Sequence, residues 1–215
     1  MAYQSLEEIA KFGETHREPF WRAVMLDDVN ERTVSEEMSV CTMREMWKAM
    51  LEASEKYDEQ LASNSGLVGG MGGKMEAYRK CGNTLGGDFM SQVIVQALQM
   101  GESNACMKRI VAAPTAGACG VLPAVLVPLY RERHVEEERI IESLFVAAGI
   151  GQVIASRAFI AGAAGGCQAE IGSASAMAAG ALVSIREGSA EQIMHAAAMA
   201  LKNLLGLVCD PVAGL

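Results

Sequence analysis

The sequence has few aromatic residues and no long uninterrupted apolar stretch. Phe, Trp and Tyr make up 5% of the 215 residues, although apolar residues together make up 51%. The core must therefore be built from Ala, Leu, Ile, Val and Met, which favours closely packed helices over an aromatic-rich β-sandwich. The longest apolar stretches, Val121–Tyr130 and Leu144–Ala155, fall short of the roughly 20 residues that span a bilayer, so we expect no membrane association.

Positive charge is also scarce, with 18 Lys and Arg against 26 Asp and Glu and a net charge of −8. An acidic chain without a basic stripe is a poor binder of nucleic acids. The N-terminal residues lack the basic and apolar regions of a secretory signal. None of the six cysteines forms a CxxC or CxxxC pair, which excludes local zinc-ribbon and ferredoxin motifs. We expect a cytoplasmic protein with reduced thiols, in which any metal site collects cysteines from distant parts of the chain.

Helical spacing of apolar residues dominates the chain, and the predicted fold is all-α. No segment shows clear period-2 alternation, although 91–97 resembles a short strand. Ser5 with Glu8 and Thr33 with Glu36 form capping-box patterns, and Ser189 and Gln192 are predicted to cap the last helix. Pro123 is compatible with the first turn of the helix predicted over 121–133. We expect a charged helical N-terminal segment (1–62) packed on a catalytic domain (63–215) whose buried helices are rich in Ala and Gly. The predicted helices beyond residue 62 are 89–100, 105–112, 121–133, 136–159, 173–186 and 189–205.

Four glycine-rich turns separate these helices: 63–74, 114–120, 162–172 and 207–215. Five glycines within 66–73 argue against a helix interior, because each costs roughly 1 kcal/mol there. This segment is either a flexible linker or a backbone cradle for an anion, with Lys74 nearby. Helix breaks inside an apolar protein bury unpaired N–H groups, so we expect the four turns to converge on one site for a small anionic molecule. Four ordinary inter-helix loops are the alternative.

The amino-acid sequences of these turns resemble those of a known family. The segments are Ser-Gly-Leu-Val-Gly-Gly (65–70), Ala-Pro-Thr-Ala-Gly-Ala-Cys-Gly-Val-Leu-Pro (113–123), a stretch containing Gly-Gly-Cys-Gln-Ala-Glu (162–175) and one containing Cys-Asp-Pro-Val (201–215). In this order they are similar to the α chain of the iron–sulfur-dependent bacterial L-serine dehydratases, from about residue 60 onward. The resemblance implies conversion of L-serine to pyruvate and ammonia.

The resemblance also implies a [4Fe–4S] cluster with three cysteine ligands, of which two correspond to Cys167 and Cys209. The third would lie beyond Leu215, so we expect residues 1–215 alone to lack a stable cluster and activity; Cys119 is a weaker stand-in. Three thiolates leave one iron open as a Lewis acid. Candidate donors to the substrate carboxylate are Ser65, Gly66, Thr115 and Gly117.

There are two candidates for the general base. Lys202 could serve if burial lowers its pKa, and Asp210 could serve unless it only orients the Cys209 loop. His195 is predicted to be structural. Two alternatives to a serine dehydratase stay open: an iron–sulfur L-cysteine desulfidase, and a helical scaffold without a stable cluster. No lysine has the context of a pyridoxal phosphate enzyme. The family pairs this chain with a β chain carrying an ACT-type regulatory domain, so we expect a hetero-oligomer.

Overall fold

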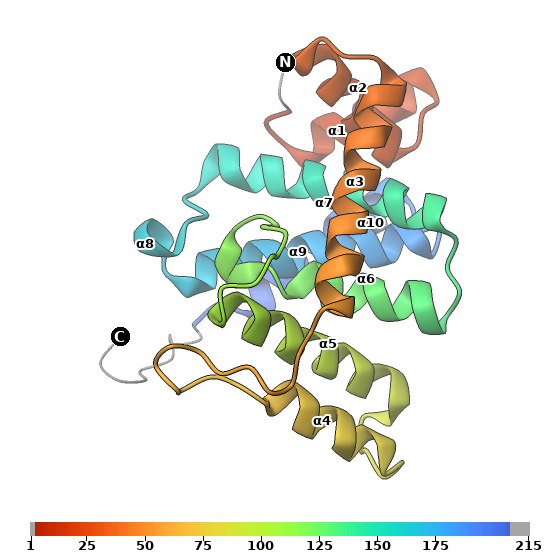
Figure 1. The fold of residues 1–215 in the computed structure, drawn as a ribbon. Coiled ribbons are helices and arrows are strands. Elements are labelled where there is room, and N and C mark those ends of the chain that lie inside the picture. The colour runs from red at the N-terminus through yellow and green to blue at the C-terminus, as the bar shows by residue number, and fades with distance from the viewer. Residues whose placement is uncertain (1–2, 207–215) are drawn as a thin grey trace. The chain divides into compact units, whose positions relative to one another are not determined.

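The structure is a computed structural model that describes residues 3–206. Within this range the chain forms ten α-helices and one 3₁₀ helix (η1) and no β-strand, which confirms the predicted all-α fold (Figure 1). The elements are α1 (Leu6–His16), α2 (Phe20–Arg32), α3 (Glu36–Glu55), α4 (Met71–Lys80), α5 (Gly87–Ala105), η1 (Ala116–Ala118), α6 (Val121–Glu132), α7 (Glu137–Arg157), α8 (Gly162–Gly165), α9 (Cys167–Ile185) and α10 (Ala190–Asn203).

The chain folds into two compact units. The first combines the chain up to Met43 with the chain from Ile141 onward, and the second is Arg44–Ile140. Helices α3 and α7 each continue from one unit into the other. The predicted division at residue 62 is a different one, based on the charged, helical composition of the first 62 residues, and it stays a prediction.

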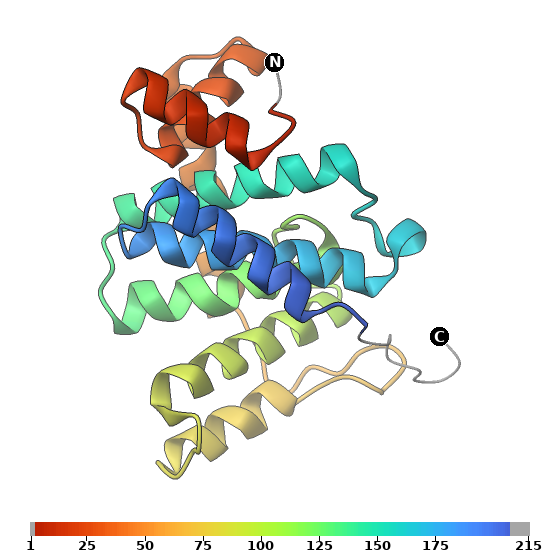
Figure 2. The same cartoon turned by 180° about the vertical axis from the view of Figure 1, so that it is seen from behind.

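In the second unit, α5 packs against both α4 and α6, and Figure 2 shows α4 and α5 as a helical hairpin. Its core contains Trp47, which is fully buried and meets the ring of Tyr130 edge-on at 5.6 Å. Residues 91–97 lie inside α5, so they are helical and not a strand. The predicted helix over 105–112 is wrong: α5 ends at Ala105, and Met107 adopts a left-handed conformation (φ 58°). The approach to Pro114 favours extended backbone, which explains why no new helix forms.

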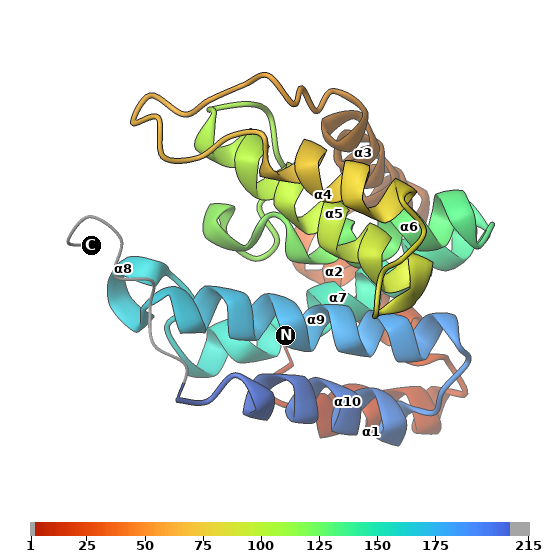
Figure 3. The same cartoon turned by 90° about the horizontal axis from the view of Figure 1, so that it is seen from below.

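In the first unit, α9 packs along α10, as Figure 3 shows, and α1 packs on α2 and α10. The buried face of α9 consists of small residues that allow close packing. A Cβ on Gly180 would lie 2.1 Å from Cδ1 of Ile150, so only glycine fits where α7 and α9 meet. The Ala- and Gly-rich composition is therefore what lets these helices approach each other.

Two of the predicted caps are present, and one is wrong. Ser189 and Gln192 form a complete capping box at α10, and Ser5 Oγ accepts from Glu8 N at 3.2 Å at α1. Thr33 instead ends α2 in a left-handed conformation (φ 54°). The cap of α3 is Ser35, whose hydroxyl accepts from Met38 N at 3.2 Å. The capping residue lies two positions after the predicted one, because the αL residue that closes α2 cannot also begin α3.

Helix α7 is long and apolar enough to cross a membrane by length and composition alone. The apolar stretch 144–155, from which we expected no membrane association, covers only part of this helix. In the structure, 61% of its most apolar 18-residue window is buried, as is common for the core helix of a soluble protein.

Candidate active site

The glycine-rich segment before α4 forms a loop closed by its own hydrogen bonds. Ser63 N donates to Val68 O at 2.8 Å, and Ser63 Oγ accepts from Val68 N at 3.2 Å and lies 3.0 Å from Ser65 Oγ. Gly66 N donates to Ser63 O at 2.8 Å. These bonds argue against the flexible-linker interpretation. Ser65 and Gly66, two of the candidate donors to a substrate carboxylate, are exposed at the tip of this loop.

The end of the same segment differs from the prediction, because α4 begins at Met71 and includes Gly72 and Gly73 in its first turn. Gly72 is needed there for space: a Cβ would lie 2.7 Å from Cγ of Gln99 and 2.9 Å from the hydroxyl of Tyr57. The prediction weighed the helix propensity of glycine alone, and the close approach of neighbouring side chains decides otherwise.

The N-terminus of α4 already holds an anion, and it is a side chain of the protein itself. The carboxylate of Glu102, which is 5% exposed, accepts from the backbone N–H of Met71 and, at 3.1 Å, from that of Gly72. It also accepts from the hydroxyl of Tyr57 at 2.6 Å, and Gly73 N donates to that hydroxyl at 3.1 Å. The N–H groups of 71–73 are therefore not free for a ligand, and the anion-cradle hypothesis with Lys74 is wrong for this part of the segment.

This arrangement also changes the acidity of Tyr57. Burial, followed by the hydrogen bond to Glu102 and the charge of that carboxylate, raises the pKa of Tyr57 to about 12. The phenol is thus held protonated, as a donor to Glu102.

The turn that follows α5 carries Thr115 and Gly117. Thr115 precedes η1 with extended backbone (φ −127°, ψ 167°), and its side chain does not cap this helix. Its hydroxyl is buried and has no hydrogen-bond partner among the described residues. Such buried unsatisfied groups are rare in native proteins and call for a structural or functional reason. Gly117 is exposed, and the neighbouring carbonyl of Ala116 accepts from Asn104 Nδ2 at 3.1 Å.

Cys119, the alternative cluster ligand, is unsuited to that role. It is 1% exposed, and its thiol lies 4.0 Å from the carbonyl oxygen of Met100. Burial raises the pKa of the Cys119 thiol to about 11, which disfavours the thiolate that a metal needs.

Cys167 is the first residue of α9, whereas the sequence predicted a turn up to Gly172 and a helix from residue 173. The single-turn helix α8 precedes it directly (Figure 3), and Gly166 joins the two with φ 79°, a conformation that favours glycine. Cys167 is exposed. A thiol at the N-terminal end of a 19-residue helix lies where the macrodipole stabilises negative charge.

The remaining predicted residues belong to α10 or follow it in the sequence. Lys202 and His195 are both exposed on α10, so Lys202 lacks the burial that the general-base hypothesis requires. Cys209 and Asp210 lie outside the described residues. Among the residues that the structure describes, no group of three or more His, Cys, Asp or Glu side chains is placed to hold a metal ion. Convergence of the four turns on one site stays a prediction.

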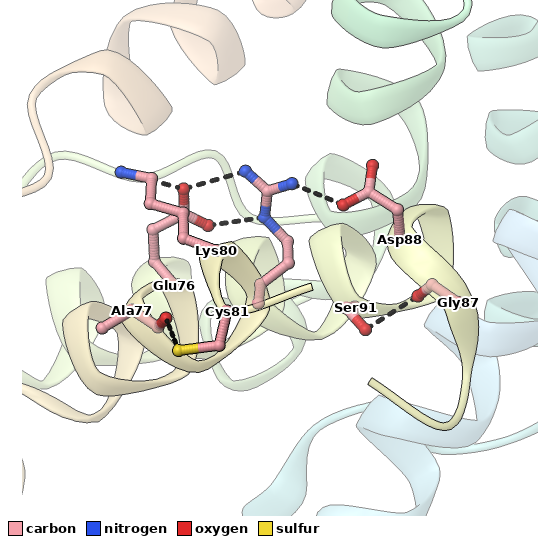
Figure 4. Close-up of polar contacts among 8 residues, drawn as sticks. Glu76, Ala77, Lys80, Cys81, Gly87, Asp88 and Ser91 are labelled. Carbon is pink, nitrogen blue, oxygen red and sulfur yellow. Dashed lines mark hydrogen bonds and ion pairs between the residues drawn. The ribbon is translucent and has the colours of Figure 1, made fainter. Parts of the chain in front are cut away.

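A polar network joins the C-terminal end of α4 to the beginning of α5 (Figure 4). The guanidinium of Arg79 donates to Glu76 at 2.8 and 2.9 Å and to Asp88 at 2.6 Å. The hydrogen bond from Arg79 holds the pKa of the Glu76 carboxyl below its usual value. The exposed thiol of Cys81, in the same view, lies 3.4 Å from Ala77 O.

The sequence analysis missed Tyr57, Glu102 and Asn104. One signal was available for Glu102, because it is the only charged residue of α5 after Asp88 in the first turn. Nothing in the spacing of Tyr57 or Asn104 marks these residues.

The chain is similar to known proteins over most of its length. A family model described as "Serine dehydratase alpha chain" matches residues 8–215, so the match starts well before residue 60, where the motifs begin. A probable L-serine dehydratase α chain of Bacillus subtilis is 46% identical over 166 residues, which are 77% of this chain and 55% of that protein. An L-serine dehydratase α chain of Peptoniphilus asaccharolyticus is 46% identical over 149 residues, which are 69% of this chain and 51% of that protein. The chain thus spans about half the length of these relatives.

Proposed function

Because the chain belongs to the serine dehydratase alpha chain family, we propose that it is the catalytic α chain of an L-serine dehydratase. The observation that carries this proposal is the family match over residues 8–215, which includes all four glycine-rich turns. The names of the relatives support L-serine as the substrate.

The proposed reaction removes water from L-serine. A base takes the proton from Cα, the bond between Cβ and oxygen breaks, and the hydroxyl leaves with a proton as water. The resulting 2-aminoacrylate tautomerises to the imine of pyruvate. A water molecule then hydrolyses the C=N bond, which yields pyruvate and ammonia.

The substrate carboxylate needs hydrogen-bond donors, and we assign these to Ser65, Thr115 and Gly117. Gly66, the fourth predicted donor, is not assigned this role, because its N–H already donates to Ser63 O at 2.8 Å. Two observations support the assignment. Ser65 is exposed on a loop that is ordered by internal bonds, and the Thr115 hydroxyl has no partner among residues 3–206. A hydroxyl held without a partner is preorganised to bind an anionic group, because it gives up no internal hydrogen bond on binding.

We further propose that Cys167 and Cys209 bind a [4Fe–4S] cluster, together with a third thiolate that the family resemblance assigns to a position beyond Leu215. The exposure of Cys167 and its location at a helix N-terminus fit a thiolate ligand. When bound, such a cluster supplies an iron with an open position that acts as a Lewis acid on the departing hydroxyl. Of the two predicted bases, Lys202 is exposed on α10 and lacks the required burial, so proton abstraction is assigned to Asp210.

Because residues 1–215 alone are expected to lack a stable cluster, the test uses the α chain extended beyond Leu215 to include the third cysteine. This protein is purified anaerobically and reconstituted with iron and sulfide, and pyruvate formation from L-serine is measured. Cys167→Ala should abolish both activity and the visible absorbance of the cluster. The matched control is Cys81→Ala, which removes another exposed thiol and should leave both unchanged. Sulfide release from L-cysteine at a higher kcat/KM than pyruvate formation from L-serine would favour a desulfidase. A protein without visible absorbance or activity after reconstitution would favour a scaffold.

The α-chain names of the relatives also support a β-chain partner. We propose that this partner carries the regulatory ACT-type domain and that the two chains form a hetero-oligomer in the cytoplasm. Co-expression with the β chain should give a complex that survives size-exclusion chromatography, and recovery of the α chain alone would contradict this.

A further inference from the structure

The C-terminal end of α5 contacts both segments that are assigned to the substrate carboxylate. Glu102 holds the N-terminus of α4, which directly follows the Ser65 loop. Two residues later on the same helix, Asn104 donates to Ala116 O, between Thr115 and Gly117. One short helical stretch therefore contacts two segments that lie more than 40 residues apart in the sequence.

The bonds of Glu102 are strong for a physical reason. A buried carboxylate is costly unless it is fully hydrogen-bonded. Here it accepts from two backbone N–H groups and one phenol, and these N–H groups form the positive end of α4. The beginning of α4 is thus fixed to α5 by charge-assisted bonds, which are about twice as strong as neutral ones.

The loop that carries Ser65 is joined directly to the beginning of α4. Its residues 63–68 are bonded to one another, so it behaves as one body. Its two ends meet closely, because a Cβ on Gly69 would lie 2.4 Å from Leu61 O. A shift of Met71 and Gly72 would therefore reorient Ser65 and Gly66 together.

We propose that Glu102 and Asn104 are positioning residues for substrate binding, which set the two carboxylate-binding segments relative to each other from α5. Neither residue is assigned a contact with substrate. Tyr57 extends this function, because its hydroxyl joins Glu102 to the N–H of Gly73. The inference rests on the proposed function, which assigns Ser65 and Thr115 to the substrate carboxylate.

The principal variant is Glu102→Gln, which keeps the shape of the side chain and removes the charge and one acceptor. We expect KM for L-serine to rise roughly tenfold, since small displacements of positioning groups are costly to the reacting complex, with a smaller change in kcat. Tyr57→Phe and Asn104→Ala should change KM in the same direction by less, because each leaves the charged contact intact.

The matched control is Ser54→Ala. It breaks another buried hydrogen bond to α5, from Ser54 Oγ to Gln96 Oε1 at 2.8 Å, and leaves both loops untouched. A residue that acts only through stability would lower the melting temperature and leave KM unchanged. We expect this behaviour from Ser54→Ala and a KM change only from the other three variants.

A second measurement does not depend on activity. In hydrogen exchange followed by mass spectrometry, Glu102→Gln should accelerate exchange in peptides that cover 63–73, and Ser54→Ala should not. Unchanged exchange in Glu102→Gln overturns the proposal, as does an unchanged KM in an active enzyme. If the wild-type protein does not convert L-serine, the proposed function fails by itself, and the exchange data still decide whether Glu102 anchors the loop.

Discussion

The unpaired hydroxyl of Thr115 gives opposite expectations for stability and for binding. Thr115→Val replaces a buried hydroxyl by a methyl group of similar size. Burying a hydroxyl without a partner costs about 1–3 kcal/mol, and Thr115 Oγ1 has no partner among the described residues. We therefore expect Thr115→Val to stabilise the protein by about 1 kcal/mol, which corresponds to a rise in melting temperature of roughly 2–4 °C for a chain of this size.

The same change should weaken substrate binding. If the Thr115 hydroxyl binds the carboxylate of L-serine, its removal should raise KM more than it lowers kcat, as expected for a lost ground-state contact. Thr115→Ser is the control, because it keeps the hydroxyl and should keep KM.

Two assays check this pair of expectations: thermal unfolding by circular dichroism, and initial rates at varied L-serine. A fall in melting temperature for Thr115→Val would mean that the hydroxyl has a hydrogen-bond partner in the folded protein. A normal KM would remove Thr115 from the substrate site.

Three further outcomes follow from burial and charge. Because its thiol is buried and its pKa is raised to about 11, Cys119 should react with a thiol reagent at pH 8 only after unfolding, and reaction in the native state would contradict its burial. The pKa of Glu76 is lowered in the folded state, so the stability that its ionised carboxylate contributes is present above its usual pKa and is lost as pH falls through the folded pKa. The free energy of unfolding in urea, measured between pH 7 and 3, should therefore depend less on pH in Glu76→Gln than in the wild-type protein. An equal pH dependence would argue against the ion pair. Gly180→Ala should destabilise the protein by about 1–3 kcal/mol through overpacking against Ile150, and unchanged unfolding in urea would show that α7 and α9 can separate without cost.

The helices that the sequence predicted correctly are those whose signals are local. Ser189 and Gln192 define a cap within four residues, and α6 tolerates Pro123 in its first turn as expected. The errors concern the structural role of glycines and hydrogen-bond partners that are distant in the sequence. The glycine-rich sequence predicted that Gly72 lies outside a helix. In the structure α4 begins before Gly72, because Glu102, 30 residues away, accepts from the first backbone N–H groups of α4. No local pattern contains that information.

The candidate site shows the same contrast between local motifs, which the sequence contains, and contacts between distant segments, which it does not. The motifs indicated Ser65, Thr115 and Cys167 from their order in the chain, and the roles of these residues stay predictions. The motifs did not indicate which N–H groups were already bonded inside the protein, nor that α9 extends back to Cys167. Both depend on packing between segments, which sequence spacing does not record.

The exposed thiols have a practical consequence for loading iron into this protein. Cys41, Cys81 and Cys167 are all exposed, and only Cys167 belongs to the proposed ligand set. During reconstitution with iron and sulfide, Cys41 and Cys81 offer accessible soft ligands that can collect metal nonspecifically or form disulfides between molecules in air. A Cys41→Ser, Cys81→Ser background removes this contribution, so that the iron content reports the cluster alone. Neither side chain is buried, and the double substitution should cost little stability.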